Sequence, residues 1–420
     1  MKIIKIDGWM VIMKFRLLTI KEYATYTVLV LYILFVTDSM IFGLNSNSTI
    51  VSYAKISIFV FLMLLLIYSF IINIKLNIKE IMVALIFVIS LLISMIFTKD
   101  FTGAYFFKIA LVIISLISAK LLNINKFIEA YINVMIFIAI FSLFAMLLQE
   151  SIIQLDLFPE ITTPKGYVFT SLGLTNIPHY NSYKIRNWGP FWEPGVFQAY
   201  LNFALFFVIY WSKNNEKKGF FRVIFISFAI LSTLSTAGII AMTLMLTSLV
   251  IKKDNNPKNI RKIALLLLFA LVSVYVLNNP HLSTMIFGKL FVHFEGNNTL
   301  MSRWYSITGI LKIYSSSLIF GVGPNNVLLE LASYANRAIS ATNTITFHFA
   351  SFGLFSGLIY IWYTYKNVIL SSKKAFATIM LIAWLSVILM SQNFTYSLFF
   401  NIFMFMSFSD KNKAKGTYNG

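Results

Sequence analysis

Long runs of apolar residues, separated by short polar stretches, dominate the pattern of the chain. A run of about 20 apolar residues can cross the hydrocarbon core of a bilayer as a helix. When Gly, Pro and charged residues are taken as the breaks between runs, the pattern predicts twelve membrane-spanning helices in one membrane domain, residues 1–420. The predicted spans are 24–42, 54–74, 81–98, 104–119, 127–149, 195–211, 220–236, 237–251, 263–277, 345–363, 376–391 and 394–408. The expected fold is therefore an all-α, polytopic integral membrane protein.

Composition and charge agree with this fold class and give it an orientation. The chain is 59% hydrophobic and only 12% charged, with a mean hydropathy of +0.80. Its net charge of +19 is a poor signal for nucleic acid, because the basic residues cluster between apolar runs. Alternate sides of the predicted spans carry 24 and 10 Lys and Arg residues. Because cytoplasmic loops are the more basic ones, we expect both termini in the cytoplasm of a bacterial inner membrane, and no nucleic-acid partner.

Two predicted loops, 150–194 and 278–344, are much longer than the others, and both face the periplasm in this orientation. The first one ends with Arg186 and, seven residues later, Glu193, which precedes the Pro-Gly pair that opens the next span. Pro suits the first position of a helix, and a carboxylate is favoured beside a helix N-terminus. Arg186 and Glu193 fit two roles, either an ion pair that anchors the loop or the cation and carboxylate of a membrane-surface active site.

The second loop contains an amphipathic pattern. Apolar residues at 300, 304, 307, 311 and 314 predict a helix that lies in the headgroup layer, flanked by Arg303 and Lys312. Such a helix serves either as an anchor or as a carrier of cations toward lipid phosphates. Further on, Arg337 and His348 bracket Asn343; a histidine at the mouth of a span is either a satisfied polar group or a catalyst.

Several kinds of chemistry have no signal in the sequence. The chain has no Cys, and we find neither a metal-ligand cluster nor a nucleotide-binding loop, so we expect no cofactor and no metal. Gly321-Val322-Gly323 is not followed by the Gly-Lys-Ser/Thr of a Walker A loop. Ionisable residues deep inside the predicted spans are scarce, since Asp38 and Lys108 lie near outer ends. This scarcity counts against an ion-coupled transporter.

The order of several short motifs resembles a known family, the O-antigen polymerase and O-antigen ligase superfamily. The resemblance is clearest over residues 180–355, and elsewhere it rests on topology alone. The motifs that carry it are Arg186, Gly189-Pro190-Phe191-Trp192-Glu193-Pro194-Gly195, Ser235-Thr236-Ala237-Gly238, Arg303 and Gly321-Val322-Gly323.

The resemblance implies an integral-membrane glycosyltransferase at the periplasmic face of the inner membrane. Its substrate would be oligosaccharide repeat units on undecaprenyl diphosphate, bound among membrane lipid, and a flippase and a chain-length regulator would be partners. The leaving diphosphate supplies the energy, so no cofactor is implied. The implied catalytic residues are Arg186, Glu193 and Arg303, and the implied substrate-binding residues are Lys184, Lys312, Arg337, Asn343 and His348.

Polymerase is the preferred activity within this superfamily. Ligases usually carry a His-Asn pair shortly before the span that follows the second loop, whereas this chain has Thr342-Asn343, with His348 further on. A ligase that transfers the polysaccharide to lipid A–core is the alternative. From another class, a flippase for lipid-linked oligosaccharides predicts short outer loops and cations inside the bundle, and the sequence shows neither.

The orientation can be tested with reporter fusions. Because of the 24-to-10 distribution of basic residues, fusions at Thr175 and Gly323 should report a periplasmic location and fusions at Asn215 and Asn256 a cytoplasmic one. Paired alkaline phosphatase and fluorescent protein fusions measure both states. A cytoplasmic signal at Thr175 or Gly323 would remove the two long loops from the side on which the lipid-linked substrate is expected.

Overall fold

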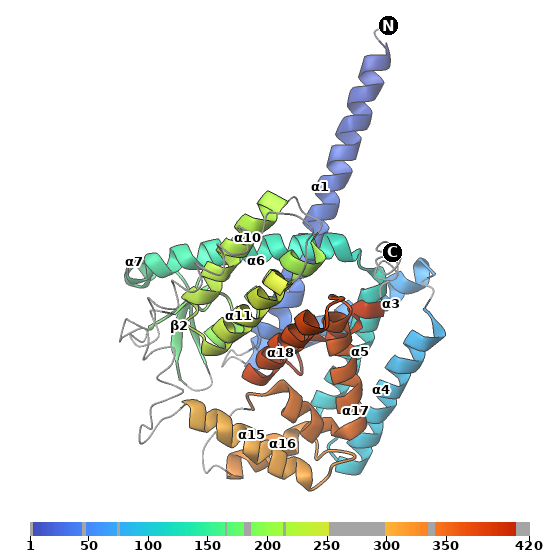
Figure 1. The fold of residues 1–420 in the computed structure, drawn as a ribbon, viewed down its shortest axis with the longest axis vertical. Coiled ribbons are helices and arrows are strands. Elements are labelled where there is room, and N and C mark those ends of the chain that lie inside the picture. The colour runs from blue at the N-terminus through green and yellow to red at the C-terminus, as the bar shows by residue number, and fades with distance from the viewer. Residues whose placement is uncertain are drawn as a thin grey trace.

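A computed structural model describes residues 3–43, 48–73, 76–163, 166–179, 186–212, 216–251, 299–334 and 341–408. Helices form most of this part of the chain (Figure 1). The elements up to the first long loop are α1 (Ile3–Asp38), α2 (Met40–Gly43), α3 (Ser48–Ile71), α4 (Ile78–Thr98), α5 (Gly103–Leu121), α6 (Ile124–Leu147) and α7 (Gln149–Leu155). The following elements are β1 (Glu160–Thr162), β2 (Val168–Ser171), β3 (Asn176–Pro178), α9 (Pro194–Phe206) with a π-helical turn (Phe207–Trp211), α10 (Glu216–Ser232), α11 (Thr236–Ile251), α15 (Thr299–Ser315), α16 (Pro324–Tyr334), α17 (Thr344–Ile369), α18 (Ala375–Ser391) and α19 (Leu398–Phe405) with a final 3-10 turn (Met406–Phe408).

Six of the described helices are long and apolar enough to cross a membrane: α3, α4, α5, α6, α9 with its π-helical turn, and α17. The prediction of twelve spans is therefore wrong for the described chain. The predicted spans 24–42, 220–236, 237–251, 376–391 and 394–408 fall on α1, α10, α11, α18 and α19, which are not among the six, and 263–277 lies outside the described residues. The physical reason is length, because a helix needs about 20 residues to cross a bilayer, whereas α10, α11, α18 and α19 have 17, 16, 17 and 8 residues.

The prediction of an all-α membrane protein is confirmed in its main part, and the first long loop adds a small sheet to it. Strands β1, β2 and β3 form an antiparallel sheet in that order, with Ile161 opposite Phe169 and Thr170 opposite Ile177. Ile161 and Phe169 pack with Trp188 and Met40 in a separate apolar cluster. The sheet thereby supports the stretch of chain that leads into α9.

Helix α9 lies in the main core. All thirteen of its residues are buried, and Phe203 packs edge-to-face on the rings of Trp384 and Phe400. The predicted division of the long apolar run is confirmed, but the break lies at residues 233–235, slightly before the predicted turn at 235–238. Leu234 there has the left-handed conformation at φ 47°. At Gly238 an added Cβ would lie 2.8 Å from the Cβ of Gln198, so a glycine allows α11 to approach α9 closely.

Helix α17 is interrupted at Gly353, which has φ 80° and ψ −179°. The chain segment before α16 packs against this interruption. The amides of Val322 and Gly323 donate to the carbonyls of Ala350 and Ser351 at 2.8 and 3.2 Å, and the amide of Leu354 donates to the carbonyl of Ile319 at 3.0 Å. The backbone groups that the break releases are therefore paired within the protein, as membrane depth requires.

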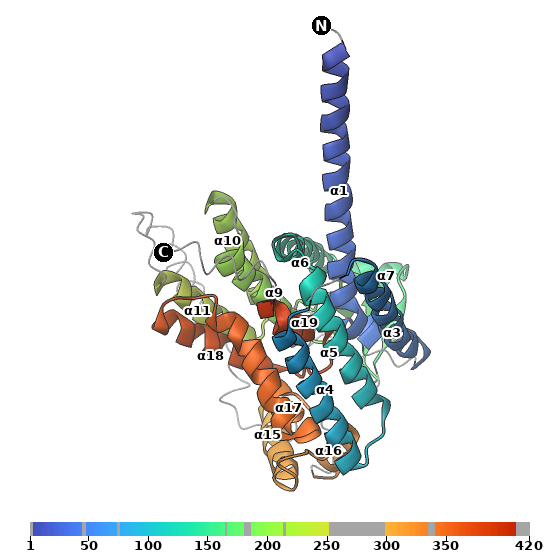
Figure 2. The same cartoon turned by 90° about the vertical axis from the view of Figure 1, so that its right-hand side faces the viewer.

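The two ends of the molecule differ in character. Figures 1 and 2 show the first half of α1 projecting away from the other helices, while α15 and α16 lie at the opposite end. The predicted amphipathic helix is present as α15; its Ser306, Gly309, Ile310 and Ile313 are buried, whereas Trp304 is 60% exposed. The exposed part of its apolar stripe is thus available to lipid.

Helix α3 is the least buried of the six candidate spans. Only 11% of its most apolar stretch is covered by protein, compared with 89% for α9 and its π-helical turn. It packs against α5, α2 and α1.

Replacing Gly353 by Ala should destabilise the protein far more than replacing Gly173 by Ala. The φ angles of the two glycines are 80° and 78°, so each Ala carries the strain of a positive φ, of order 1–3 kcal/mol. At Gly353 an added Cβ would also lie 2.2 Å from the carbonyl oxygen of Ile319, whereas at Gly173 nothing lies within 4 Å. We expect a much larger fall in the apparent Tm of the detergent-solubilised protein for Gly353→Ala. Equal shifts would show that the close approach to α17 is unimportant.

Candidate functional site

The start of α9 presents a carboxylate at the surface. Glu193 is the N-cap residue of α9 and Pro194 the first helical residue, as the sequence predicts. The side chain of Glu193 is exposed and does not cap the helix; its Oε2 accepts a hydrogen bond from Nε2 of Gln392 at 2.8 Å. The preceding Phe191 is buried and stacks on Tyr200 with ring centroids 4.6 Å apart, which fixes the loop to α9.

Arg186 joins this loop to the turn between α10 and α11. Its Nε donates to the carbonyl of Thr233 at 3.2 Å and its Nη2 to the carbonyl of Leu234 at 3.4 Å. The amide of Asn187 donates to the carbonyl of Ser232 at 3.0 Å. Because carbonyls at a helix C-terminus favour a cation, these contacts anchor the loop. The motifs at 186–195 and 235–238, far apart in the sequence, thus form one packed unit around α9.

The glycine motif before α16 has a different environment. An added Cβ at Gly321 would lie 2.7 Å from the carbonyl oxygen of Ala350, and one at Gly323 would lie 2.6 Å from Oδ2 of Asp100. Oδ2 of Asp100 also accepts from the amide of Asn325, at 3.0 Å, in the first turn of α16. The chain's own carboxylate thus occupies the N-terminus of α16, where a phosphate could otherwise bind. The motif packs α16 against α4, α5 and α17.

Asn343 and His348 are inside the protein. Asn343 is the fully buried N-cap residue of α17 and accepts from the amide of Thr346 at 3.1 Å. His348 is 1% exposed; its Nε2 lies 3.0 Å from the hydroxyl of Ser356 and its ring stacks on Tyr360 with centroids 4.4 Å apart. Both therefore contact groups of the chain itself, and a substrate would have to displace these groups to reach them.

The other cationic residues expected at the site are only partly described. Lys184 and Arg337 lie outside the described residues. Arg303 lies near the start of α15, but its side chain is outside the described part of the chain. Lys312 is exposed near the end of the same helix. In the described chain, Arg186 and Glu193 belong to one packed unit, whereas Lys312 is exposed on α15, a helix that packs with α16 and α17.

A short non-helical segment, residues 392–397 between α18 and α19, connects these parts, and we refer to it as the 392–397 segment. The carbonyl of Gln392 accepts from the amide of Thr344 at 3.1 Å and from its hydroxyl at 2.6 Å. Ser397 is the N-cap residue of α19 and donates its hydroxyl to Oδ2 of Asp38 at 2.7 Å. The segment therefore links α9, α17 and α1, which the sequence analysis missed because these contacts join residues far apart in the chain.

Lys108 holds the same segment from inside the bundle. Its side chain is completely buried, and Nζ donates to the carbonyl of Thr395 at 2.9 Å and to Oδ1 of Asn401 at 2.7 Å. The ammonium also lies 4.8 Å from the ring centroid of Tyr360, a cation–π contact. Asp38 is the last residue of α1 and Lys108 lies in the second turn of α5, so both are near helix ends as the sequence predicts. The 392–397 segment covers them and leaves Asp38 only 2% exposed.

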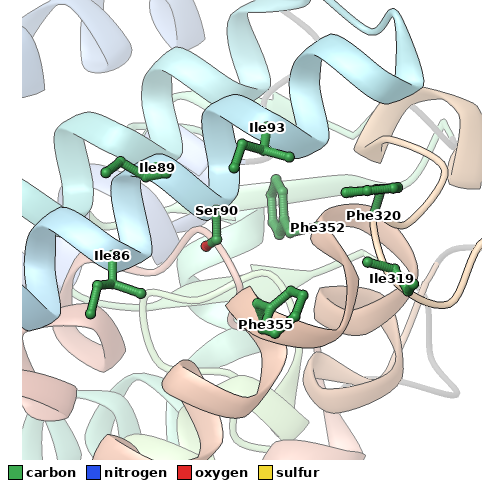
Figure 3. A pocket seen from close by; sticks show the side chains of 8 residues that line it. All are labelled: Ile86, Ile89, Ser90, Ile93, Ile319, Phe320, Phe352 and Phe355. Carbon is green, nitrogen blue, oxygen red and sulfur yellow. The ribbon is translucent and has the colours of Figure 1, made fainter.

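An apolar groove of about 190 Å³ lies between α4 and α17. Figure 3 shows Ile86, Ile89 and Ile93 of α4 facing Phe352 and Phe355 of α17, with Ile319 and Phe320 at one end. The hydroxyl of Ser90 is the one polar side-chain group in the lining. Because Ile86 and Phe355 are 49% and 59% exposed on candidate spans, this groove would face lipid hydrocarbon in a bilayer.

Comparison with known proteins adds no assignment, since no family model, curated protein or solved structure matches the chain. Within the described residues, no group of three or more His, Asp or Glu side chains is arranged to hold a metal ion. The chemistry available at the described site is thus that of an exposed carboxylate on a rigid support.

Replacing Lys108 by Met should lower stability. Met keeps the length of the side chain but removes the donor to Oδ1 of Asn401, and a buried acceptor left without a partner costs about 1–3 kcal/mol. The matched control is Lys79→Met, because Lys79 is exposed on α4. Thermal unfolding in detergent should show a lower apparent Tm for Lys108→Met alone. Two variants of equal Tm would mean that the ammonium does not hold the 392–397 segment.

Proposed function

We propose that the chain is a membrane glycosyltransferase that polymerises undecaprenyl-diphosphate-linked repeat units into O-antigen or a related surface polysaccharide, at the periplasmic face of the bacterial inner membrane. The observation that carries the proposal is the packed unit formed by residues 186–195 and 235–238, which presents Glu193 at the surface. These are two of the motifs on which the family resemblance depends. Their assembly around one exposed carboxylate supports a shared role.

The proposed reaction needs a proton acceptor and cations. A hydroxyl at the non-reducing end of the incoming unit attacks the anomeric carbon that joins the growing chain to its diphosphate. The carbon–oxygen bond to the diphosphate breaks, and undecaprenyl diphosphate leaves with the bonding electrons. Glu193 takes the proton of the attacking hydroxyl as general base and later releases it to water. No external energy source is required, because the diphosphate is a good leaving group.

Cations near the headgroup layer would stabilise the departing diphosphate. Arginine suits this task because its guanidinium is always charged and donates two parallel hydrogen bonds to phosphate. Arg303 is the proposed phosphate ligand, since it lies on α15 with the exposed apolar residues Trp304 and Leu311. Arg186 shares the proposed role, and its contacts with the turn at 233–234 also support the anchoring role.

The two alternatives differ in what they require. A ligase would use the same surface with lipid A–core as acceptor. A flippase for lipid-linked oligosaccharide is favoured by one specific observation, the cation of Lys108 buried inside the bundle. Lys108 is, however, engaged by Thr395, Asn401 and Tyr360, which suits a structural role better than passage of a substrate.

Deletion of the chain from its host should leave lipid A–core that carries a single repeat unit, because ligation still runs. Gel ladders of extracted lipopolysaccharide measure this directly. Complementation with wild type should restore the ladder, and Arg303→Ala should not, since loss of a charge-assisted contact to the leaving group costs on the order of 3 kcal/mol, about a hundredfold in rate. Lys79→Ala, an exposed position on α4, is the control for loss of a positive charge.

Two other outcomes would refute parts of this proposal. Loss of even the single unit from otherwise intact core would indicate a ligase or a flippase instead. A normal ladder from Arg303→Ala, at normal abundance in the membrane, would remove Arg303 from phosphate recognition. Membrane abundance is measured in parallel by immunoblot, so that a failure to insert is not read as a loss of activity.

A further inference from the structure

Gln392 is held at both of its ends. Its carbonyl accepts from the amide and the hydroxyl of Thr344, at 3.1 and 2.6 Å, which ties the main chain to the first turn of α17. Its side chain is also covered, since the residue is only 5% exposed, and Nε2 donates to Oε2 of Glu193 at 2.8 Å. A long side chain fixed in this way has little freedom to change its conformation.

Other residues of the 392–397 segment are also held in place by hydrogen bonds. Thr395 is held by Lys108, and Ser397 by Asp38. The amide of Phe394 donates to the hydroxyl of Thr344 at 2.8 Å. The amide group that contacts Glu193 is therefore mounted on a support that is pinned to α5, α1 and α17.

The glycine at 195 makes room for this contact. An added Cβ at Gly195 would lie 2.5 Å from Nε2 of Gln392. Gly195 is the second residue of α9, and the space that a side chain would take at this position is used by the amide of Gln392.

The carboxylate of Glu193 is consequently held by one oxygen. Oε2 accepts from Gln392, and within the described residues Oε1 has no hydrogen-bond partner. We propose that Gln392 is the positioning residue of the site: it fixes the orientation of the Glu193 carboxylate so that Oε1 faces the attacking hydroxyl of the acceptor sugar. The inference rests on the proposed function, because it assigns a task to the proposed base.

Two single variants test this role without touching Glu193. Gly195→Ala should push the amide of Gln392 away, and because that amide is the far end of a side chain, the backbone need not move. Gln392→Ala removes the amide without adding an atom near Glu193. In membranes given purified lipid-linked repeat unit, both should lower kcat between about ten- and a hundredfold, the range for a misplaced catalytic group, with KM changed less than about twofold. Gly103→Ala is the matched control, because Gly103 also begins a helix but has no atom within 4 Å of an added Cβ.

An exchange of the two side chains tests whether the carboxylate must stand at position 193. The double variant Glu193→Gln, Gln392→Glu keeps an amide–carboxylate hydrogen bond but moves the carboxylate to the buried position. We expect normal membrane abundance with no polymer. If the exchange restores polymer as well, the contact is structural and the inference is overturned.

The wild-type control distinguishes failure of the inference from failure of the proposed function. Wild-type membranes that form no polymer from the lipid-linked unit would refute the function itself. Wild-type membranes that polymerise, together with normal kcat per amount of protein for both Gly195→Ala and Gln392→Ala, would refute only the role of Gln392.

Discussion

The pairing of backbone groups at two interruptions in the helical bundle is the constraint on which this structure depends. A buried amide or carbonyl without a hydrogen-bond partner is costly, so each interruption needs a partner from elsewhere in the chain. The backbone amides and carbonyls around the break at Gly353 form hydrogen bonds with the backbone of residues 318–323. The polar groups of the 392–397 segment and of Leu398 form hydrogen bonds with Lys108, with Thr344 and with residues at the end of α1. These pairings bring segments far apart in the sequence to the same end of the bundle.

The constraint also explains why charged groups are found inside the protein. The ammonium of Lys108 and the carboxylate of Asp38 each hold one end of the 392–397 segment, and neither is at the surface. Glu193 differs because it is exposed and is held by a neutral amide. Lys108 and Asp38 are engaged by groups of the chain itself, whereas Glu193 has one oxygen held and is accessible to a substrate. The chain thus separates the residues that hold the site from the residue proposed to act in it.

Local sequence rules predicted the local parts of the structure. Pro194 marks the start of α9, the small residues at 235–238 mark a turn, and the apolar stripe from 300 to 314 marks α15. Hydropathy could not count the spans, because an apolar run does not show where the helix within it begins and ends; α19, for example, has only eight residues. Strands of three or four residues, as in β1 to β3, are too short for the alternation of apolar and polar residues to be recognised. The partnership of Gln392 with Glu193 joins positions 199 residues apart, which periodicity cannot reveal.

The low burial of α3 has a consequence for handling the protein. Lipid tails are as apolar as the side chains of this helix, so no hydrophobic gain drives it toward its neighbours. Close packing and the hydrogen bond between the hydroxyls of Tyr32 and Ser57, at 3.4 Å, hold it in place. With 11% of its most apolar stretch covered by protein, α3 has little of that packing. The surrounding lipid therefore supplies most of its contacts and acts as part of the fold. When detergent replaces lipid, α3 is the element whose position is least determined by the protein itself, and retained native lipid is the natural means of keeping it docked on α5.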